Sequence, residues 1–117
     1  MVDSSRDSAR AIRDNLESLG LSERARVMEK KAGPALKLLE AEGESFGLVF
    51  MDPPYGGNEA GRTLRLLSGL SLLEPEAVVV VEHDPGAGLS ETYGDLSRTD
   101  LRTYGGTAVS FYERTEP

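Results

Sequence analysis

Two short apolar runs, separated by a segment with helical spacing, constrain the fold of this chain more than any other feature. Residues 48–51 and 78–81 are continuous apolar runs bounded by turn residues, which is typical of strands buried on both faces. Between them, leucines recur at the spacing of one helix face in a segment that starts near 58–61 and stops before Pro75. A strand, a helix and a strand in this order predict a right-handed crossover and a parallel sheet.

The N-terminal segment predicts an amphipathic helix. Ser4 and Asp7 resemble a capping box, with Asp in place of the usual Glu, and an apolar stripe then follows over residues 9–19. Gly20 suits the left-handed position that ends a helix. The stripe must therefore face a sheet or another helix.

Further elements follow on either side of the two central strands. Residues 26–30 predict a short strand, and Pro34, as a first helical residue, predicts a helix that ends near Gly43. Near the C-terminus, Gly105-Gly106 separates residues 100–104 from residues 108–111 and suits a tight hairpin turn. We therefore expect an α/β fold with a mostly parallel sheet and a C-terminal antiparallel hairpin.

Length and composition indicate one soluble globular domain or part of one. The 117 residues are 38% hydrophobic and 28% charged, and without cysteine the chain has no disulfide or thiolate site. The longest purely apolar run, 77–81, is far too short to span a membrane, so a cytoplasmic location is the default. His83, the only histidine, is expected to be a packed strand-end residue, and no cluster has metal-ligand spacing.

The charge is unevenly distributed along the chain. The net charge is −7, but residues 1–39 carry eight Lys/Arg against six Asp/Glu, whereas residues 40–117 carry five against fourteen. An acidic surface repels phosphate backbones. Overall charge does not predict a nucleic-acid partner, so any RNA contact must be local or lie elsewhere.

The tetrapeptide Asp52-Pro53-Pro54-Tyr55 carries the candidate chemistry. It directly follows the first apolar run, and ligands of parallel sheets bind at the carboxyl ends of strands. Asp52 and the Pro53 carbonyl can accept hydrogen bonds from an exocyclic amine of a nucleobase and aim its lone pair at a methyl donor. Pro54 stiffens the loop, and Tyr55 offers a flat face for an unstacked base. A plain Pro-Pro turn is the alternative, but it leaves the acid and the aromatic unexplained.

These residues, taken with others, resemble the bacterial family of 16S rRNA guanine-N2 methyltransferases. The resemblance covers nearly the whole chain in order. Its motifs are the Asp-Pro-Pro-Tyr loop, Val80-Val81-Glu82-His83, Tyr104-Gly105-Gly106-Thr107 and the helical segment Ile12-Arg13-Asp14-Asn15-Leu16. The resemblance implies a Rossmann-like, doubly wound methyltransferase fold, S-adenosylmethionine as cofactor and small-subunit ribosomal RNA as partner.

The resemblance also implies the cofactor residues. Asp3 occupies the position of the acid that binds the ribose hydroxyls of the cofactor, with Ser4 beside it. Without the resemblance, Asp3 would be interpreted as an acid that flanks the helix and interacts with its dipole. Lys31 and Ala32 stand where relatives contact the adenine, and because many relatives have an acid there, contacts here could only be backbone or apolar. Asp52 belongs to the cofactor set as well as to the catalytic one.

One part of the family pattern has no counterpart. Its first strand and Gly-rich cofactor loop are absent from the sequence, so we expect residues 1–117 to form a single, N-terminally truncated methyltransferase domain. The exposed sheet edge that results would favour a homodimer. Two alternatives stay open: an adenine-N6 methyltransferase of DNA, which shares the tetrapeptide, and an inactive remnant that acts as a binding module.

Overall fold

The computed structural model describes residues 1–53 and 58–115 and shows an α/β fold with two separate sheets. The first sheet pairs β1 (Val2–Asp3) with β2 (Met28–Glu29) in parallel. The second has five strands in the order β3-β4-β7-β6-β5. Its strands are β3 (Phe46–Met51), β4 (Leu73–His83), β5 (Thr92–Tyr93), β6 (Leu96–Tyr104) and β7 (Thr107–Arg114).

The predicted crossover is present, but the larger sheet is mixed and not mostly parallel. β3 and β4 pair in parallel on either side of α3 (Glu59–Gly69), as the sequence predicts. The other three pairings of this sheet are antiparallel. Antiparallel pairings outnumber the parallel one because β6 and β7 form the C-terminal hairpin and β5 folds back onto β6. Within this sheet, only β3 and β4 are consecutive strands joined by a helix.

The N-terminal helix α1 (Arg6–Ser18) forms where the apolar stripe predicts it. Its buried residues are Ala9 and Leu16, and the chain leaves it through Gly20 with φ +70°. A positive φ favours glycine because it has no Cβ to clash with the backbone. A short 3₁₀ turn, Ser22–Arg24, then leads to β2.

The second helix, α2 (Ala32–Ala41), begins two residues earlier than predicted. The sequence predicts Pro34 at the first helical position, whereas it lies at the third. The fold tolerates it there because the first four N–H groups of a helix have no partner within the helix. The helix ends before Gly43, whose φ is +77°.

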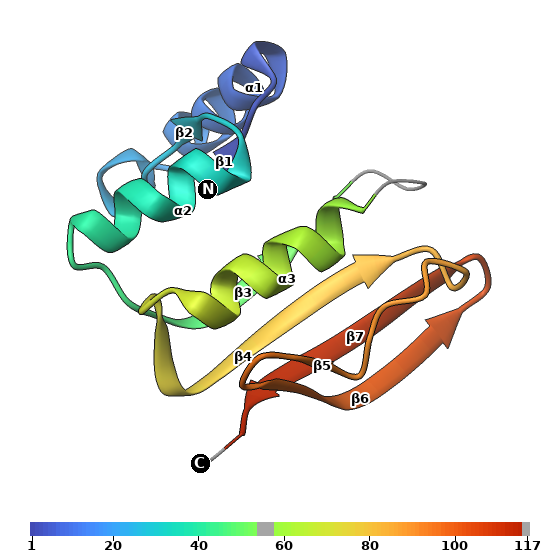
Figure 1. Cartoon of the computed structure of the whole chain (residues 1–117). Helices are drawn as coiled ribbons and strands as arrows, with labels where there is room; N and C mark the ends of the chain where they lie inside the picture. The colour runs from blue at the N-terminus through green and yellow to red at the C-terminus, as the bar shows by residue number, and fades with distance from the viewer. Residues whose placement is uncertain (54–57, 116–117) are drawn as a thin grey trace.

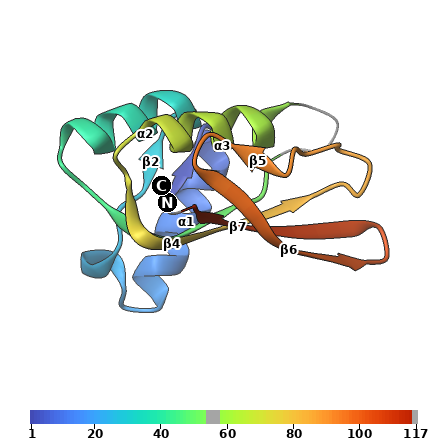
Figure 2. The same cartoon turned by 60° about the horizontal axis from the view of Figure 1, so that its bottom comes forward.

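One face of the larger sheet is covered and the other is open. α2 and α3 lie along the same side of the sheet (Figures 1 and 2), and the core forms between that face and the helices. The sequence predicts residues 48–51 to be buried on both faces, and this is wrong: Leu48 is 67% exposed and Phe50 63% exposed. Val49 and Met51, which alternate with them, pack against the core. Among the described residues no further layer covers the outer face.

Candidate active site

The first group of predicted site residues gathers at the carboxyl end of β1. Asp3 is half-buried, and its Oδ1 accepts a hydrogen bond of 2.8 Å from the Ser5 backbone N–H. The cap of α1 is Ser5 and not Ser4, because Ser5 Oγ accepts the Ser8 backbone N–H at 3.2 Å. An N-cap side chain bonds the second or third helical N–H, and Ser8 is the third residue of α1. Ser4 is exposed and outside the cap.

Lys31 and Ala32 lie at the neighbouring end of β2. The Lys30 backbone N–H donates to the Asp3 carbonyl at 3.1 Å, which holds the two strand ends together. Lys31 is the exposed N-cap of α2 and provides no side-chain cap, and the half-buried Ala32 opens the helix. The structure therefore brings these residues next to Asp3, beside a helix N-terminus whose backbone donors can meet an acceptor.

Asp52 and Pro53 form the second group. They directly follow β3, whose last residue, Met51, pairs with Val81 of β4. Asp52 is exposed and Pro53 half-buried, so a carboxylate and a carbonyl stand at the carboxyl end of a sheet strand, as expected. Pro54 and Tyr55 lie outside the described residues.

The two groups belong to different sheets. β1 pairs with β2, and β3 pairs with β4, but in the described part of the chain β1 and β3 are not paired with each other. Figure 1 shows the smaller sheet set apart from the larger one. The smaller sheet therefore holds the first group, which is Asp3, Ser4, Lys31 and Ala32. The second group, Asp52 and Pro53, lies at a strand end of the larger sheet.

His83 is a structural residue at the end of β4. It is 6% exposed, and its Nδ1 lies 2.9 Å from the Asp84 carbonyl, while its Nε2 lies 2.7 Å from Ser110 Oγ. A carbonyl can only accept, so Nδ1 carries a proton and donates to it. With both ring nitrogens engaged, His83 is packed and hydrogen-bonded, as the sequence predicts.

Two polar residues of the C-terminal hairpin are not singled out by the sequence, the buried Ser110 and the half-buried Arg98. Ser110 is fully buried on β7 between inward-facing Ala108 and Tyr112, and a serine at an inward position was a usable signal. Arg98 on β6 packs its guanidinium over the Tyr112 ring, with 5.7 Å from Cζ to the ring centroid. Nothing in the local sequence marks Arg98, because the hairpin register brings it there.

The described residues provide neither a metal-ion site nor a membrane-spanning helix. No group of three or more His, Cys, Asp or Glu side chains in residues 1–53 and 58–115 could hold a metal ion. No helix in those ranges is long and apolar enough to cross a membrane.

Comparison with known proteins places the chain in a family. A family model described as "conserved hypothetical protein 95" matches residues 1–113. The chain belongs to this family. It is 34% identical to the Bacillus subtilis protein named "Putative rRNA methyltransferase YlbH", over 97% of this chain and 61% of that protein. The chain thus spans less than two thirds of the length of this relative.

Solved structures of similar proteins share the fold of this member of the conserved hypothetical protein 95 family. A conserved hypothetical protein from Streptococcus pyogenes is similar with a TM-score of 0.86 and 27% identity, over 97% of this chain and 69% of that one. The "putative methylase HI0767" from Haemophilus influenzae is similar with a TM-score of 0.81 and 26% identity, over 98% and 71%. The resemblance to rRNA methyltransferases drawn from the sequence motifs is confirmed at the level of the family.

Proposed function

We propose that this chain takes part in cytoplasmic methyl transfer from S-adenosylmethionine to the exocyclic N2 of guanine in small-subunit ribosomal RNA. The observation that carries the proposal is Asp52-Pro53 at the carboxyl end of β3, in a chain 34% identical to a protein named as an rRNA methyltransferase. SMU.776, which shares the fold at 12% identity and a TM-score of 0.69, was solved in complex with SAH.

Asp52 and Pro53 would orient the amine. The lone pair of an aromatic amine is delocalised into its ring, so the nitrogen attacks poorly until acceptors draw its two hydrogens away from the ring plane. The exposed Asp52 carboxylate and the Pro53 carbonyl supply two such acceptors at one strand end. The carboxylate also stabilises the positive charge that develops on the nitrogen. Tyr55 would stack the base, which must be unpaired or flipped to reach the loop.

The residues at β1 and β2 fit part of the cofactor. S-adenosylmethionine supplies a methyl group on a sulfonium. Asp3 uses Oδ1 to hold the loop at Ser5, which leaves its second carboxylate oxygen to accept a ribose hydroxyl. The uncapped start of α2 at Lys31 and Ala32 offers backbone donors to the adenine. In residues 1–53 and 58–115, none takes the role of the Gly-rich loop under the methionine part of the cofactor.

Substitution of Asp52 tests the proposal. With labelled S-adenosylmethionine and small-subunit RNA, we expect N2-methylguanosine from the wild type and about 100-fold less from Asp52→Asn, because one aligned charge is lost. Asp100→Asn removes the same charge from an exposed residue of the hairpin and should keep the yield. Nucleoside mass spectrometry measures the product.

The same assay repeated with adenine-containing duplex DNA, together with a calorimetric titration, separates the alternatives. N6-methyladenine in DNA, without a guanine product in RNA, would favour the adenine-N6 reaction. Calorimetry without heat at millimolar S-adenosylmethionine would exclude the enzyme function for the isolated chain and leave the binding module.

We also propose that the open edge of β3 pairs with a second copy of the chain. β3 is the first strand of its sheet, and Leu48 and Phe50 are exposed beside that edge. An unpaired strand edge with apolar side chains favours pairing with another chain.

A further inference from the structure

The outer face of the larger sheet carries a continuous apolar patch, on the side that α2 and α3 leave open (Figures 1 and 2). One row across β3, β4 and β7 consists of Phe50, Val80 and Phe111, which are paired neighbours. The adjacent row pairs Leu48 with Val78. These side chains are exposed or half-buried. The outer patch, as we call it, consists of Leu48, Phe50, Val78, Val80, Val109 and Phe111.

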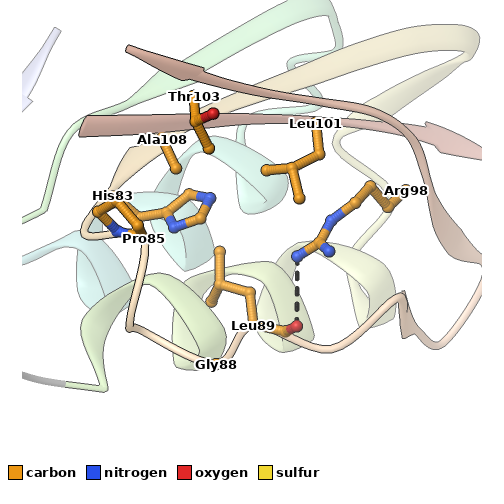
Figure 3. A pocket seen from close by; sticks show the side chains of 8 residues that line it. All are labelled: His83, Pro85, Gly88, Leu89, Arg98, Leu101, Thr103 and Ala108. Carbon is orange, nitrogen blue, oxygen red and sulfur yellow. Dashed lines mark hydrogen bonds between the residues drawn. The ribbon is translucent and has the colours of Figure 1, made fainter. Parts of the chain in front are cut away.

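The opposite face of the same strands is occupied by other parts of the chain. In Figure 3, Leu101 and Thr103 point toward the segment that contains Leu89 and, with His83 and Arg98, line a pocket of about 130 Å³. The helices α2 and α3 lie along this same side. Because side chains alternate along a strand, the strand neighbours of Leu101 and Thr103 share the face of the outer patch.

Carboxylates stand at both ends of the outer patch. Glu113 pairs with Val78, and Glu82 pairs with Val109. Neither carboxylate forms a salt bridge with any residue that the structure describes. They belong to the part of the chain, residues 40–117, that carries fourteen acids against five bases. The rim of the patch is therefore negatively charged.

Arg102 on β6 does not compensate this charge. Its Nε donates to Asp100 Oδ2 at 3.0 Å, and its guanidinium lies over the Phe111 ring, with 5.7 Å from Cζ to the ring centroid. The ion pair leaves no net charge at this place. The long side chain borders the patch on its β6 side.

An apolar centre with an acidic rim selects the kind of partner. Contiguous exposed apolar patches mark contacts with proteins, whereas carboxylates repel the phosphates of RNA and of anionic lipids. A second copy laid face to face would bring Glu82 and Glu113 against the same acids, and like charges across an interface oppose association. A basic segment of another protein satisfies both the apolar centre and the rim.

The size of the outer patch fits a helix. Three neighbouring strands span about 10 Å, and three alternate rows along them span about 13 Å. A helix is about 10–12 Å wide and rises about 1.5 Å per residue, so two to three turns cover this area. A helix also pairs its own backbone groups, whereas an extended segment laid on the face of a sheet would leave its N–H and C=O groups without partners.

We propose that the outer patch binds an amphipathic helix of a partner protein, with aliphatic side chains against Phe50, Val80 and Phe111 and Lys or Arg beside Glu82 and Glu113. Such a helix lays its apolar stripe on the patch. Pairing of a second copy at the β3 edge leaves this face open, because that edge bonds through its backbone. The proposal does not rest on methyl transfer.

A synthetic peptide tests the proposal on the full chain. The probe is about 15 residues long and consists of Leu, Ala and Lys, with leucines at i, i+4 and i+7. Fluorescence anisotropy of the labelled peptide measures binding without cofactor or RNA. We expect saturable binding of this peptide and none of the matched peptide that has Glu in place of every Lys.

Two apolar variants locate the site. Phe50→Thr should weaken binding by about tenfold or more, because the ring loses its burial under the helix. Val80→Thr should weaken it by about threefold or more, because a hydroxyl is buried without a partner, and Val80 lies on β4, away from the β3 edge. Leu38→Thr is the control, since Leu38 is 36% exposed on α2, on the covered side of the sheet. Circular dichroism checks that each variant is folded.

A charge variant tests the rim without altering the apolar centre. Glu82→Gln should weaken binding of the Lys peptide by about threefold, as expected for one half-exposed ion pair. Glu91→Gln, an exposed residue in the segment that follows β4, should leave binding unchanged.

Several outcomes would overturn the proposal. Equal binding of the Lys and Glu peptides would remove the role of the rim, and equal effects of Phe50→Thr and Leu38→Thr would place the peptide elsewhere. Binding of a single-stranded RNA or an anionic vesicle that is lost in Val80→Thr would assign the face to a phosphate surface. A heavier species in sedimentation that Val80→Thr converts to a monomer would assign it to a second copy. Peptide binding without any RNA methylation would keep this proposal and defeat only the proposed function.

Discussion

At the scale of single residues, the buried hydroxyl of Tyr112 links the strand face to the segment over it. It donates to the Ser90 carbonyl at 2.7 Å, while the Ser90 backbone N–H donates to the Tyr93 hydroxyl at 2.9 Å. Tyr112 is fully buried, and its ring meets that of Tyr93 edge to face at 5.8 Å between centroids. These contacts hold the segment around Ser90 against the strand face.

Tyr112→Phe should lower the free energy of unfolding by about 1–2 kcal/mol, since it leaves the Ser90 carbonyl without its donor. Urea denaturation measures the loss. Tyr104→Phe is the matched control, because Tyr104 is 61% exposed and its hydroxyl can bond water. Equal losses in the two variants would contradict the role of the Tyr112 hydroxyl.

Stability should also depend on Tyr112 at alkaline pH. Burial raises the pKa of the Tyr112 hydroxyl above its ordinary value of 10.0. The unfolded chain therefore loses this proton at a lower pH than the folded chain, so the contribution is fully present below about pH 10 and declines as pH rises above it. We expect a shallower alkaline loss of stability in Tyr112→Phe than in the wild type. The same pH profile in both would exclude this contribution.

At the scale of elements, the sequence predicts helices well where the signal is local. The apolar stripe of α1 and the leucines of α3 locate both helices, and Gly105 with φ +60° begins the two-residue turn of the predicted hairpin. Such signals depend on neighbours three or four residues apart, or on one backbone angle. Boundaries are less certain, as Ser4 and Pro34 show, because several residues near a helix start can satisfy its free N–H groups.

Ser5→Ala should destabilise α1 and the protein by about 1 kcal/mol, because the Ser8 N–H loses its side-chain acceptor. The change in free energy is measured by urea denaturation followed by circular dichroism. Ser4→Ala is the control, since Ser4 is exposed and makes no cap. If Ser4→Ala were the more costly substitution, the cap would have been assigned to the wrong serine.

At the scale of the whole molecule, β3 combines exposed apolar side chains on its outer face with a strand edge that pairs with no other described strand. Leu48 and Phe50 lie on that strand, with Asp52 just beyond its end. Any chain that pairs with β3 therefore comes close to the proposed acceptor site. Assembly and activity are expected to be coupled for that reason.

Phe50→Lys should reduce self-association. We expect the wild type to sediment as a species heavier than a monomer at high concentration, and Phe50→Lys to sediment as a monomer, because a charge at the edge opposes pairing. Leu19→Lys is the control, since Leu19 is 70% exposed at the end of α1, away from β3. A wild type that remains monomeric in analytical ultracentrifugation would refute the proposed dimer.

The strand, helix, strand order and the position of Asp52-Pro53 at a strand end could be predicted from the sequence alone. These follow from periodicity and motif, which are local. Other features emerge only from the folded arrangement: β3 is an edge strand with one bare face, the two groups of site residues lie on different sheets, and Arg98 lines the same pocket as His83. The place of Asp3 beside Lys31 and Ala32, which the family resemblance implies, also depends on the pairing of β1 with β2. Each of these depends on which distant strands pair. An apolar run such as residues 48–51 has the same sequence pattern whether one face of the strand is covered or both are.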